Sequence, residues 1–143
     1  MTPDQIFSLC NTTALLGWLV LLFAPFWKNR VYYVFGLIII LFAIIYAWLI
    51  FSQFDPGIFK SFGTLDGVAG LFSDKRMLLA GWVHFLAFDL LAGIYITRSA
   101  QAHQINHWLI TPALALTFML GPVGVLVYTL IRVVKTRRYF SDL

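Results

Sequence analysis

The fold is decided by residues 77–97, MLLAGWVHFLAFDLLAGIYIT, an apolar stretch in which Asp89 is the only charged residue. This stretch is long enough to cross a bilayer as a helix, since about 20 helical residues span the hydrocarbon core. Similar stretches occupy residues 5–27, 31–51 and 108–131. They show no strand-like alternation, and a lipid-exposed backbone must satisfy its own hydrogen bonds. We therefore expect an all-α integral membrane protein: four transmembrane helices forming one bundle and one domain over residues 1–143.

The composition supports this expectation. Of the 143 residues, 61% are hydrophobic and 11% are charged, whereas a soluble domain is about half apolar and about a quarter charged. So little charge cannot cover a water-facing surface, which excludes a soluble enzyme, a disordered regulator and a nucleic-acid-binding domain. The single cysteine, Cys10, excludes an intramolecular disulfide and a cysteine-ligated iron–sulfur cluster.

The distribution of Lys and Arg predicts the orientation. With four spans, one side carries Lys28, Arg30 and Arg98, and the other carries Lys60, Lys75, Arg76, Arg132, Lys135, Arg137 and Arg138. The positive-inside rule assigns the more basic side to the cytoplasm. We therefore expect both termini and the connection 52–76 on the cytoplasmic side.

The connection 52–76 contains TLDGVAGLF, residues 64–72, which mixes apolar residues with Asp66 and two glycines. This stretch is too short to span a bilayer. It is expected to form either a short amphipathic helix in the membrane interface, a re-entrant segment or an ordered loop. Ser73 or Asp74 then caps the third span.

Asp89 falls near the middle of the third span, level with Gly121 and Pro122 of the fourth. A charged group at this depth costs several kcal/mol if it faces lipid, so Asp89 is expected to face the bundle interior. Burial favours the neutral carboxyl, which can donate a proton. The alternative is a structural hydrogen bond that clasps two helices.

His84 is the second candidate group. Its depth matches that of Asn11 on the first span and Tyr128 on the fourth, so we expect a polar layer with Asn11 or Tyr128 as its partner. His84 and Asp89 are separated by about 140° around a helix, so they would flank one cavity rather than share a face. The alternative for His84 is a packing role.

Two further patterns occur in the last third of the chain. GPVG, residues 121–124, predicts a kink in the fourth span that forms part of a pocket wall. His103 and His107 have i, i+4 spacing, which is compatible with a metal site. No third ligand accompanies them, so we expect an exposed loop pair, and we expect neither a metal nor a redox cofactor.

Two runs of sequence resemble a known membrane family. They are DGVAGLFSDKRMLLAGWVHFLAFDL at residues 66–90 and LTFMLGPVGVLVYTLIR at residues 116–132. They are similar to the family typified by the plant abscisic-acid-deficient-four protein, which is implicated in making neoxanthin from violaxanthin. The resemblance implies a carotenoid-modifying membrane enzyme or an essential component of one. Because no plastid transit peptide is present, we expect a bacterial inner membrane or a cyanobacterial thylakoid or plasma membrane.

The implied reaction converts an epoxide end group to an allenic alcohol, which is an isomerisation that needs a base and an acid. His84 is the predicted base, Asp89 or Tyr128 is the predicted acid, and Asn11 is predicted to orient His84 or the substrate oxygen. The predicted substrate contacts are Trp18, Asp66, Trp82, Phe85, Phe88, Gly121, Pro122 and Arg132, together with Asn11.

Other functions remain open from the sequence. One is a non-catalytic subunit that binds a carotenoid or lipid. Another is a small transporter or channel with Asp89 as its proton or cation site, although paired discontinuous helices are typical of transporters. A carotenoid-cleaving oxygenase would need iron, for which three scattered histidines are a poor ligand set. A homodimer with shared grooves would give a long polyene more surface.

Overall fold

The computed structural model describes residues 1–52, 55–137 and 139, and these residues form helices and connections with no strand among them. The elements are α1 (Pro3–Phe23), α2 (Arg30–Tyr33), the π-helix η1 (Val34–Ile39), α3 (Ile40–Phe51), α4 (Ile58–Ser61), α5 (Leu65–Phe72), α6 (Lys75–Ala102), α7 (His107–Leu120) and α8 (Pro122–Thr136). The expectation of an all-helical chain is confirmed.

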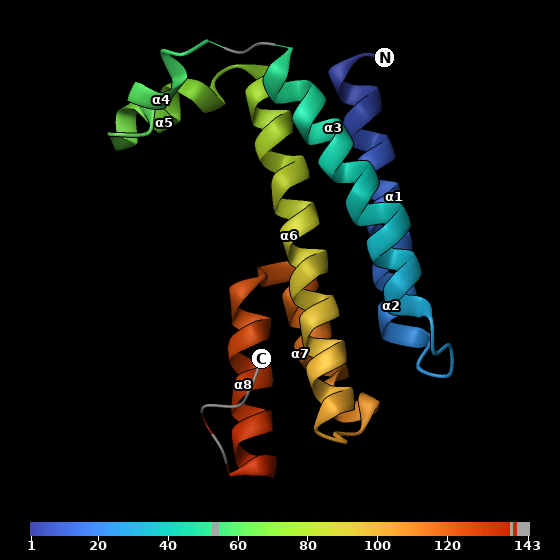
Figure 1. Cartoon of the computed structure of the whole chain (residues 1–143). Helices are drawn as coiled ribbons and strands as arrows, with labels where there is room; N and C mark the ends of the chain where they lie inside the picture. The colour runs from blue at the N-terminus through green and yellow to red at the C-terminus, as the bar shows by residue number, and fades with distance from the viewer. Residues whose placement is uncertain (53–54, 138, 140–143) are drawn as a thin grey trace.

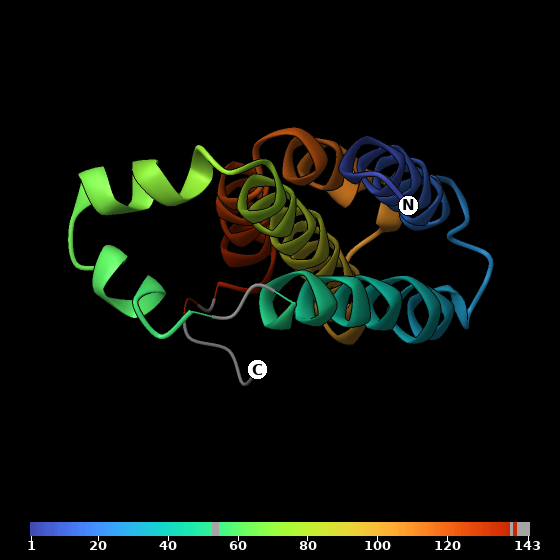
Figure 2. The ribbon, with the colours of Figure 1, turned by 90° about the horizontal axis from the view of Figure 1, so that it is seen from above.

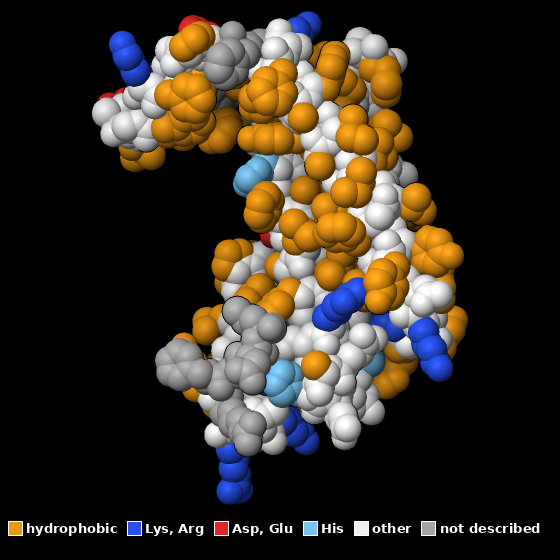
Figure 3. Space-filling view, in the orientation of Figure 1, with side chains coloured by type: hydrophobic (Ala, Val, Ile, Leu, Met, Phe, Trp, Pro, Cys, Tyr) orange, Lys and Arg blue, Asp and Glu red, His pale blue; other side chains and the backbone are white. Residues whose placement is uncertain are grey.

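Three of the helical runs are long and apolar enough to cross a membrane: α1, the continuous run of α2, η1 and α3, and α6. They correspond to the predicted spans 5–27, 31–51 and 77–97. Large apolar side chains such as Leu16 and Ile44 are more than half exposed on their outer faces, and Figure 3 shows hydrophobic side chains over much of the lateral surface. Such a surface suits lipid rather than water.

The helix starts follow local sequence signals. Thr2 and Gln5 form a reciprocal capping box at the start of α1. The Asp74 carboxylate accepts hydrogen bonds from the amides of Arg76 and Met77 at 2.9 and 3.0 Å, which confirms Asp74 as the cap of α6. These caps fix the first turns of two of the long helices.

Helix α6 is the central element. Figure 2 shows α1, α3, α7 and α8 arranged around it, and each of them packs against it. The core between these helices is made of fully buried side chains such as Trp18, Phe42, Val83 and Leu90. Helix α6 is therefore held by helices from both the first and the last part of the chain.

The predicted fourth span, residues 108–131, is wrong. Gly121 has φ +43° and separates α7 from α8, and α8 runs back beside α7 (Figure 1). A Cβ atom built on Gly124 would collide with the Oγ1 of Thr117 and the carbonyl oxygen of Ala113. In one straight helix, residues 117 and 124 would stand about 10 Å apart along the axis, so this contact requires a reversed chain.

The α7–α8 hairpin does not cross the molecule. Its helices have 14 and 15 residues, hence lengths of about 21 and 22 Å, which fall short of a hydrocarbon core of about 30 Å. Sequence reasoning expected a proline kink that preserves the direction of the helix. The left-handed φ of Gly121 instead turns the chain back, and Pro122 begins the returning helix. Among the described residues, three helical runs rather than four are therefore long and apolar enough to cross a membrane.

The reversal moves the C-terminal helix to the other end of the molecule. Helix α8 ends at the end of the molecule opposite the N-terminus (Figure 1), whereas the four-span prediction placed these two ends of the chain together. We call the end where α1, α6 and α8 terminate the basic end. Its Lys and Arg residues, within the described part of the chain, are Lys28, Arg30, Arg98, Arg132, Lys135 and Arg137; the predicted contribution of Arg138 lies outside the described residues. Lys60, Lys75 and Arg76 belong to the opposite end.

Helices α4 and α5 pack on each other and project sideways from the ends of α3 and α6 that lie nearest the N-terminus (Figures 1 and 2). We call them the α4–α5 arm. Thr64 caps α5 by accepting a hydrogen bond from the amide of Gly67 at 3.1 Å. Of the alternatives expected for residues 64–72, the structure therefore shows a short helix. The arm overhangs one side of α6.

Candidate functional site

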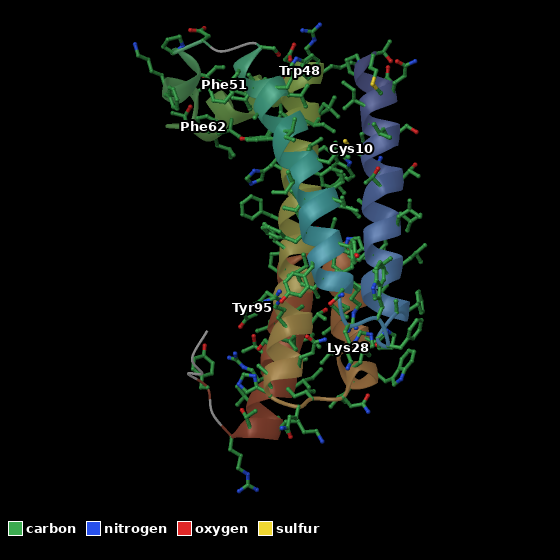
Figure 4. All side chains as sticks on the ribbon, turned by 45° about the vertical axis from the view of Figure 1, so that its right-hand side comes forward. Cys10, Lys28, Trp48, Phe51, Phe62 and Tyr95 are labelled. Carbon is green, nitrogen blue, oxygen red and sulfur yellow. The ribbon has the colours of Figure 1, made fainter. Side chains whose placement is uncertain are left out.

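A cavity lies between the α4–α5 arm, α3 and α6, with a volume of about 350 Å³. Its walls are mainly apolar and include Phe59, Phe62 and Phe72 from the arm. Figure 3 shows the molecule hollowed below the arm, and Figure 4 shows Phe51 and Phe62 where α3 meets the arm. The volume falls within the range of about 300–1,000 Å³ typical of small-molecule sites.

His84 lines this cavity and is exposed. Its ring stacks on Phe88, with centroids 4.4 Å apart and an interplanar angle of 29°. Tyr46 of α3 lies on another side, with centroids 5.5 Å apart. The imidazole is therefore held by two aromatic rings at the edge of an apolar cavity.

Asp89 lies beside the turn of the hairpin. Its residue is only 7% exposed, and its Oδ1 atom lies 2.7 Å from where a Cβ on Gly121 would stand. Only glycine permits this approach of carboxyl to backbone. Helix α8 begins at Pro122 directly after this turn, so the positive end of its dipole lies near the carboxyl group. The prediction that Asp89 lies close to Gly121 and Pro122 is confirmed.

His84 and Asp89 are offset by about 7.5 Å along the axis of α6. A ligand lying across α6 between the arm and the hairpin would pass first His84 and then Asp89. Phe88, which is 58% exposed, lies between them in sequence and offers an apolar contact. His84 and Phe88 on the exposed side of α6, together with the buried Asp89 further along the helix, make up the candidate site.

Tyr128 and Arg132 do not join that site. Both are buried on α8, near the basic end. The ring of Tyr128 meets Tyr95 edge-on at 6.2 Å, and Arg132 donates to the Tyr95 hydroxyl at 3.3 Å and to the Tyr139 carbonyl at 3.1 Å. The predicted polar layer containing His84 and Tyr128 is wrong, because the hairpin carries Tyr128 away from the arm.

Asn11 also has a different partner. Its Oδ1 accepts a hydrogen bond from the indole Nε1 of Trp82 at 2.8 Å. Trp82 and His84 point in directions about 200° apart on α6. Asn11 therefore contacts the face of α6 opposite to His84. The predicted pairing of Asn11 with His84 is therefore wrong.

The remaining predicted substrate contacts are dispersed. Trp18 is 1% exposed and packs on Gly93 and on the ring of Phe118 at 5.6 Å. Trp82 and Phe85 are exposed, their ring centroids lie 5.6 Å apart in a tilted arrangement, and Phe7 of α1 packs against Trp82 on the same face of α6. Asp66 is exposed in the first turn of α5. Of the predicted aromatic contacts, the structure places Phe88 beside His84.

A family model described as ABA DEFICIENT 4-like matches residues 5–128. This chain belongs to that family. The ABA DEFICIENT 4-like family relates broadly to neoxanthin synthesis in the carotenoid pathway. No curated protein and no solved structure matches the chain. The match to the ABA DEFICIENT 4-like model includes His84, Asp89, Gly121 and Tyr128 and ends before Arg132.

The histidines near the basic end are not an exposed pair in this ABA DEFICIENT 4-like chain. His103 and His107 are both half-buried. The Nδ1 of His103 lies 2.8 Å from the Ser99 carbonyl oxygen, and the Nε2 of His107 lies 2.9 Å from that of Leu22. Within the described part of the chain, no group of three or more His, Cys, Asp or Glu residues is arranged to hold a metal ion.

Sequence reasoning missed Tyr46 and the arm's aromatic residues. Tyr46 is the only hydroxyl-bearing residue of α3, and that isolation in an apolar span was a usable signal. The arm residues Phe59, Phe62 and Phe72 carried no such signal, because their approach to His84 depends on how the arm folds over α6.

Proposed function

We propose that this chain is a membrane-embedded enzyme that isomerises the end group of a carotenoid by acid–base catalysis. The observation that carries the proposal is an imidazole, His84, at the edge of a mainly apolar cavity, with a buried carboxyl group, Asp89, about 7.5 Å further along the axis of the same helix. Membership of the ABA DEFICIENT 4-like family supports the substrate class.

The proposed reaction converts a 5,6-epoxide end group to an allenic alcohol. A base removes the C7 proton, and the electron pair of that C–H bond forms the C6=C7 double bond. The C6–O bond breaks, and the oxygen receives a proton from an acid to become a hydroxyl group. One proton is lost and one is gained, so the product is an isomer of the substrate.

We assign the base to His84 and the acid to Asp89. His84 is exposed to the cavity, where an end ring would bring its C7 proton. Asp89 lies deeper, beside the hairpin turn, and in its protonated form its carboxyl would serve as the acid. Phe88 and the cavity's phenylalanines would pack against the apolar ring and polyene. Tyr128, buried beside Tyr95, is not assigned to this step.

The test is expression in a carotenoid-producing bacterium that also carries an epoxidase, with pigments separated by chromatography. We expect an allenic product with the unaltered chain. His84→Ala and Asp89→Asn are each expected to lower its yield by about 10²-fold or more, the contribution typical of one general acid or base. His103→Ala is the matched control, because His103 caps the C-terminal end of α6 and its ring contacts the Ser99 carbonyl oxygen far from the cavity.

An unchanged pigment profile with the folded, unaltered chain would refute the enzymatic proposal. Full activity in both His84→Ala and Asp89→Asn would refute the site assignment instead. The second candidate function is a carotenoid-binding subunit, which the mainly apolar lining of the cavity favours. A pigment that co-purifies with the chain but is never converted would support that function.

We also propose an orientation. The basic end faces the cytoplasm and the N-terminus faces the opposite compartment. The positive-inside rule supports this, because the hairpin places α8 and its cations with Lys28 and Arg98.

A further inference from the structure

A second, smaller cavity lies at the basic end, where the start of α2 meets α6 and the start of α7. Its volume is about 190 Å³. Its polar lining residues are Arg30, Thr97, Gln101 and His107. This volume is below the range of about 300–1,000 Å³ that holds drug-sized ligands, so the cavity suits a small polar group rather than a carotenoid.

Arg30 is the charged residue among those that line this cavity, and it is only 2% exposed. Its Nη1 donates to the carbonyl oxygens of Pro25 and Trp27 at 2.7 and 3.3 Å. Its Nη2 lies 3.5 Å from the Nδ1 of His107, and its buried Nε has no hydrogen-bond partner. The edge of the guanidinium formed by Nε and Nη2 therefore has donor capacity that the protein leaves largely unused.

His107 does not supply an opposing charge. Its Nε2 must donate to the Leu22 carbonyl oxygen at 2.9 Å, which leaves Nδ1 to accept from Arg30. Burial lowers the pKa of His107; the hydrogen bond to Leu22 raises it, and the charge of Arg30 lowers it again. The imidazole is thus neutral at neutral pH, and among the described residues that line the cavity only Arg30 is charged.

No carboxylate compensates Arg30 within the described residues. Asp4, Asp55, Asp66 and Asp74 lie toward the opposite end, and Asp89 lies by the hairpin turn; Asp142 is outside the described residues. Carbonyl oxygens solvate part of the guanidinium but carry no formal charge. A buried cation without a counter-ion is strongly destabilising, and an anion in the adjoining cavity would remove that penalty.

The surroundings favour an oxyanion. Helix α7 begins at His107, and Ile105, His107 and Ile110 line the cavity, so the positive end of the α7 dipole adjoins it. Gln101 contributes an amide that can donate. A planar guanidinium edge binds two oxygens of a phosphate at once. Figure 4 shows Lys28 at the same end of the molecule, where a membrane's headgroups would lie.

We propose that this cavity binds a phosphate oxyanion through Arg30, as the headgroup phosphate of an anionic phospholipid at the basic end of the molecule. This site lies at the far end of α6 from His84 and does not depend on the carotenoid chemistry. The other cations of the basic end attract the same lipids, and the Arg30 cavity adds a specific binding site for one phosphate group.

The test uses the full chain in phosphate-free detergent micelles, with the melting temperature followed by tryptophan fluorescence. Phosphatidylglycerol, phosphatidylcholine and inorganic phosphate are titrated separately at constant ionic strength. We expect phosphatidylglycerol to raise the melting temperature more than phosphatidylcholine does, because a ligand that binds only the folded state stabilises it.

Arg30→Gln removes the charge, and Arg30→Lys keeps the charge but loses the two-donor edge. Both are expected to weaken the apparent affinity for phosphatidylglycerol by about tenfold or more. Arg98→Gln is the matched control, since Arg98 is an exposed cation of the same end that lies over the ring of Tyr32. If Arg30→Gln does not fold, Arg30→Lys still decides the question.

A wild-type response in Arg30→Lys, or an equal loss in Arg98→Gln, would overturn the proposal in favour of general charge attraction. The proposal would also be overturned if none of the three phosphate compounds shifted the melting temperature. A shift with inorganic phosphate alone that Arg30→Lys abolishes would keep the site and identify its ligand as soluble phosphate rather than lipid.

Discussion

The contact between Gly124 and Thr117 holds the two helices of the hairpin together, so Gly124→Ala is the sharpest test of the fold. A Cβ at residue 124 would overlap the Oγ1 and amide nitrogen of Thr117 and the carbonyl oxygen of Ala113. Two of these atoms belong to the backbone of α7. Thr117 is also fully buried and donates to Ala113 at 2.8 Å, so it has no room to withdraw.

The magnitude follows from two opposing effects. Overpacking a well-packed contact costs about 1–3 kcal/mol, and the upper part of that range applies where backbone must move. Replacing glycine by alanine inside a helix returns up to about 1 kcal/mol. We therefore expect Gly124→Ala to reduce the free energy of unfolding by about 2 kcal/mol, which corresponds to roughly 4–8 °C in melting temperature for a chain of this size.

The assay is thermal unfolding of the purified full chain in detergent, with Gly36→Ala as the matched control. A Cβ on Gly36 would meet nothing within 4 Å. Gly36→Ala therefore has the favourable helix propensity of alanine without a steric clash. We expect the control to melt at the wild-type temperature or slightly above it.

Equal melting temperatures for Gly124→Ala, Gly36→Ala and the wild type would refute the hairpin. Such a result would fit a continuous fourth span, in which Gly124 and Thr117 are about 10 Å apart along the axis and alanine is harmless. The experiment thus separates the α7–α8 hairpin from the four-span bundle that the sequence predicts.

Two further predictions concern orientation and Tyr128. Reporter fusions at the two termini should show the C-terminus in the cytoplasm and the N-terminus in the opposite compartment, because the hairpin gathers the cations at one end; a common location would contradict the hairpin topology. Tyr128→Phe should change the free energy of unfolding by less than about 1 kcal/mol, because the buried hydroxyl has no hydrogen bond of good geometry within the described residues. Tyr128→Ala should cost about 3–5 kcal/mol in the same chemical-denaturation assay, through the cavity left beside Tyr95; a large loss in Tyr128→Phe would show that the hydroxyl has a partner.

The long helices were predictable because each is set by local features. Asp74 caps α6 through amides two and three residues ahead, and the uninterrupted apolar run 31–51 leaves a helix as the only backbone that lipid tolerates. The nearness of Asp89 to Gly121 was also predictable from depth alone. This prediction is correct although the predicted topology is wrong, because Asp89 and Gly121 lie near the middle of the molecule in either arrangement.

The partners of His84 and Asn11 were not predictable in the same way. Residues at the same depth along the membrane normal were expected to meet, but contacts also depend on the direction in which each helix presents a side chain. Asn11 faces Trp82 and not His84, while His84 faces Tyr46 and Phe88. The side of α6 that each neighbour occupies is a property of the packed helices.

The sequence by itself determined that the chain is apolar, helical and similar to one family, because these properties depend on composition and on motifs that are contiguous along the chain. Only the tertiary structure decided that Gly121 reverses the chain. Glycine occupies positive and negative φ with similar ease, so GPVG permits both a kink and a reversal. The close contact between Gly124 and Thr117 is possible only in the reversed chain. The reversal in turn decides at which end of the molecule Tyr128, the C-terminal helix and its charged residues lie.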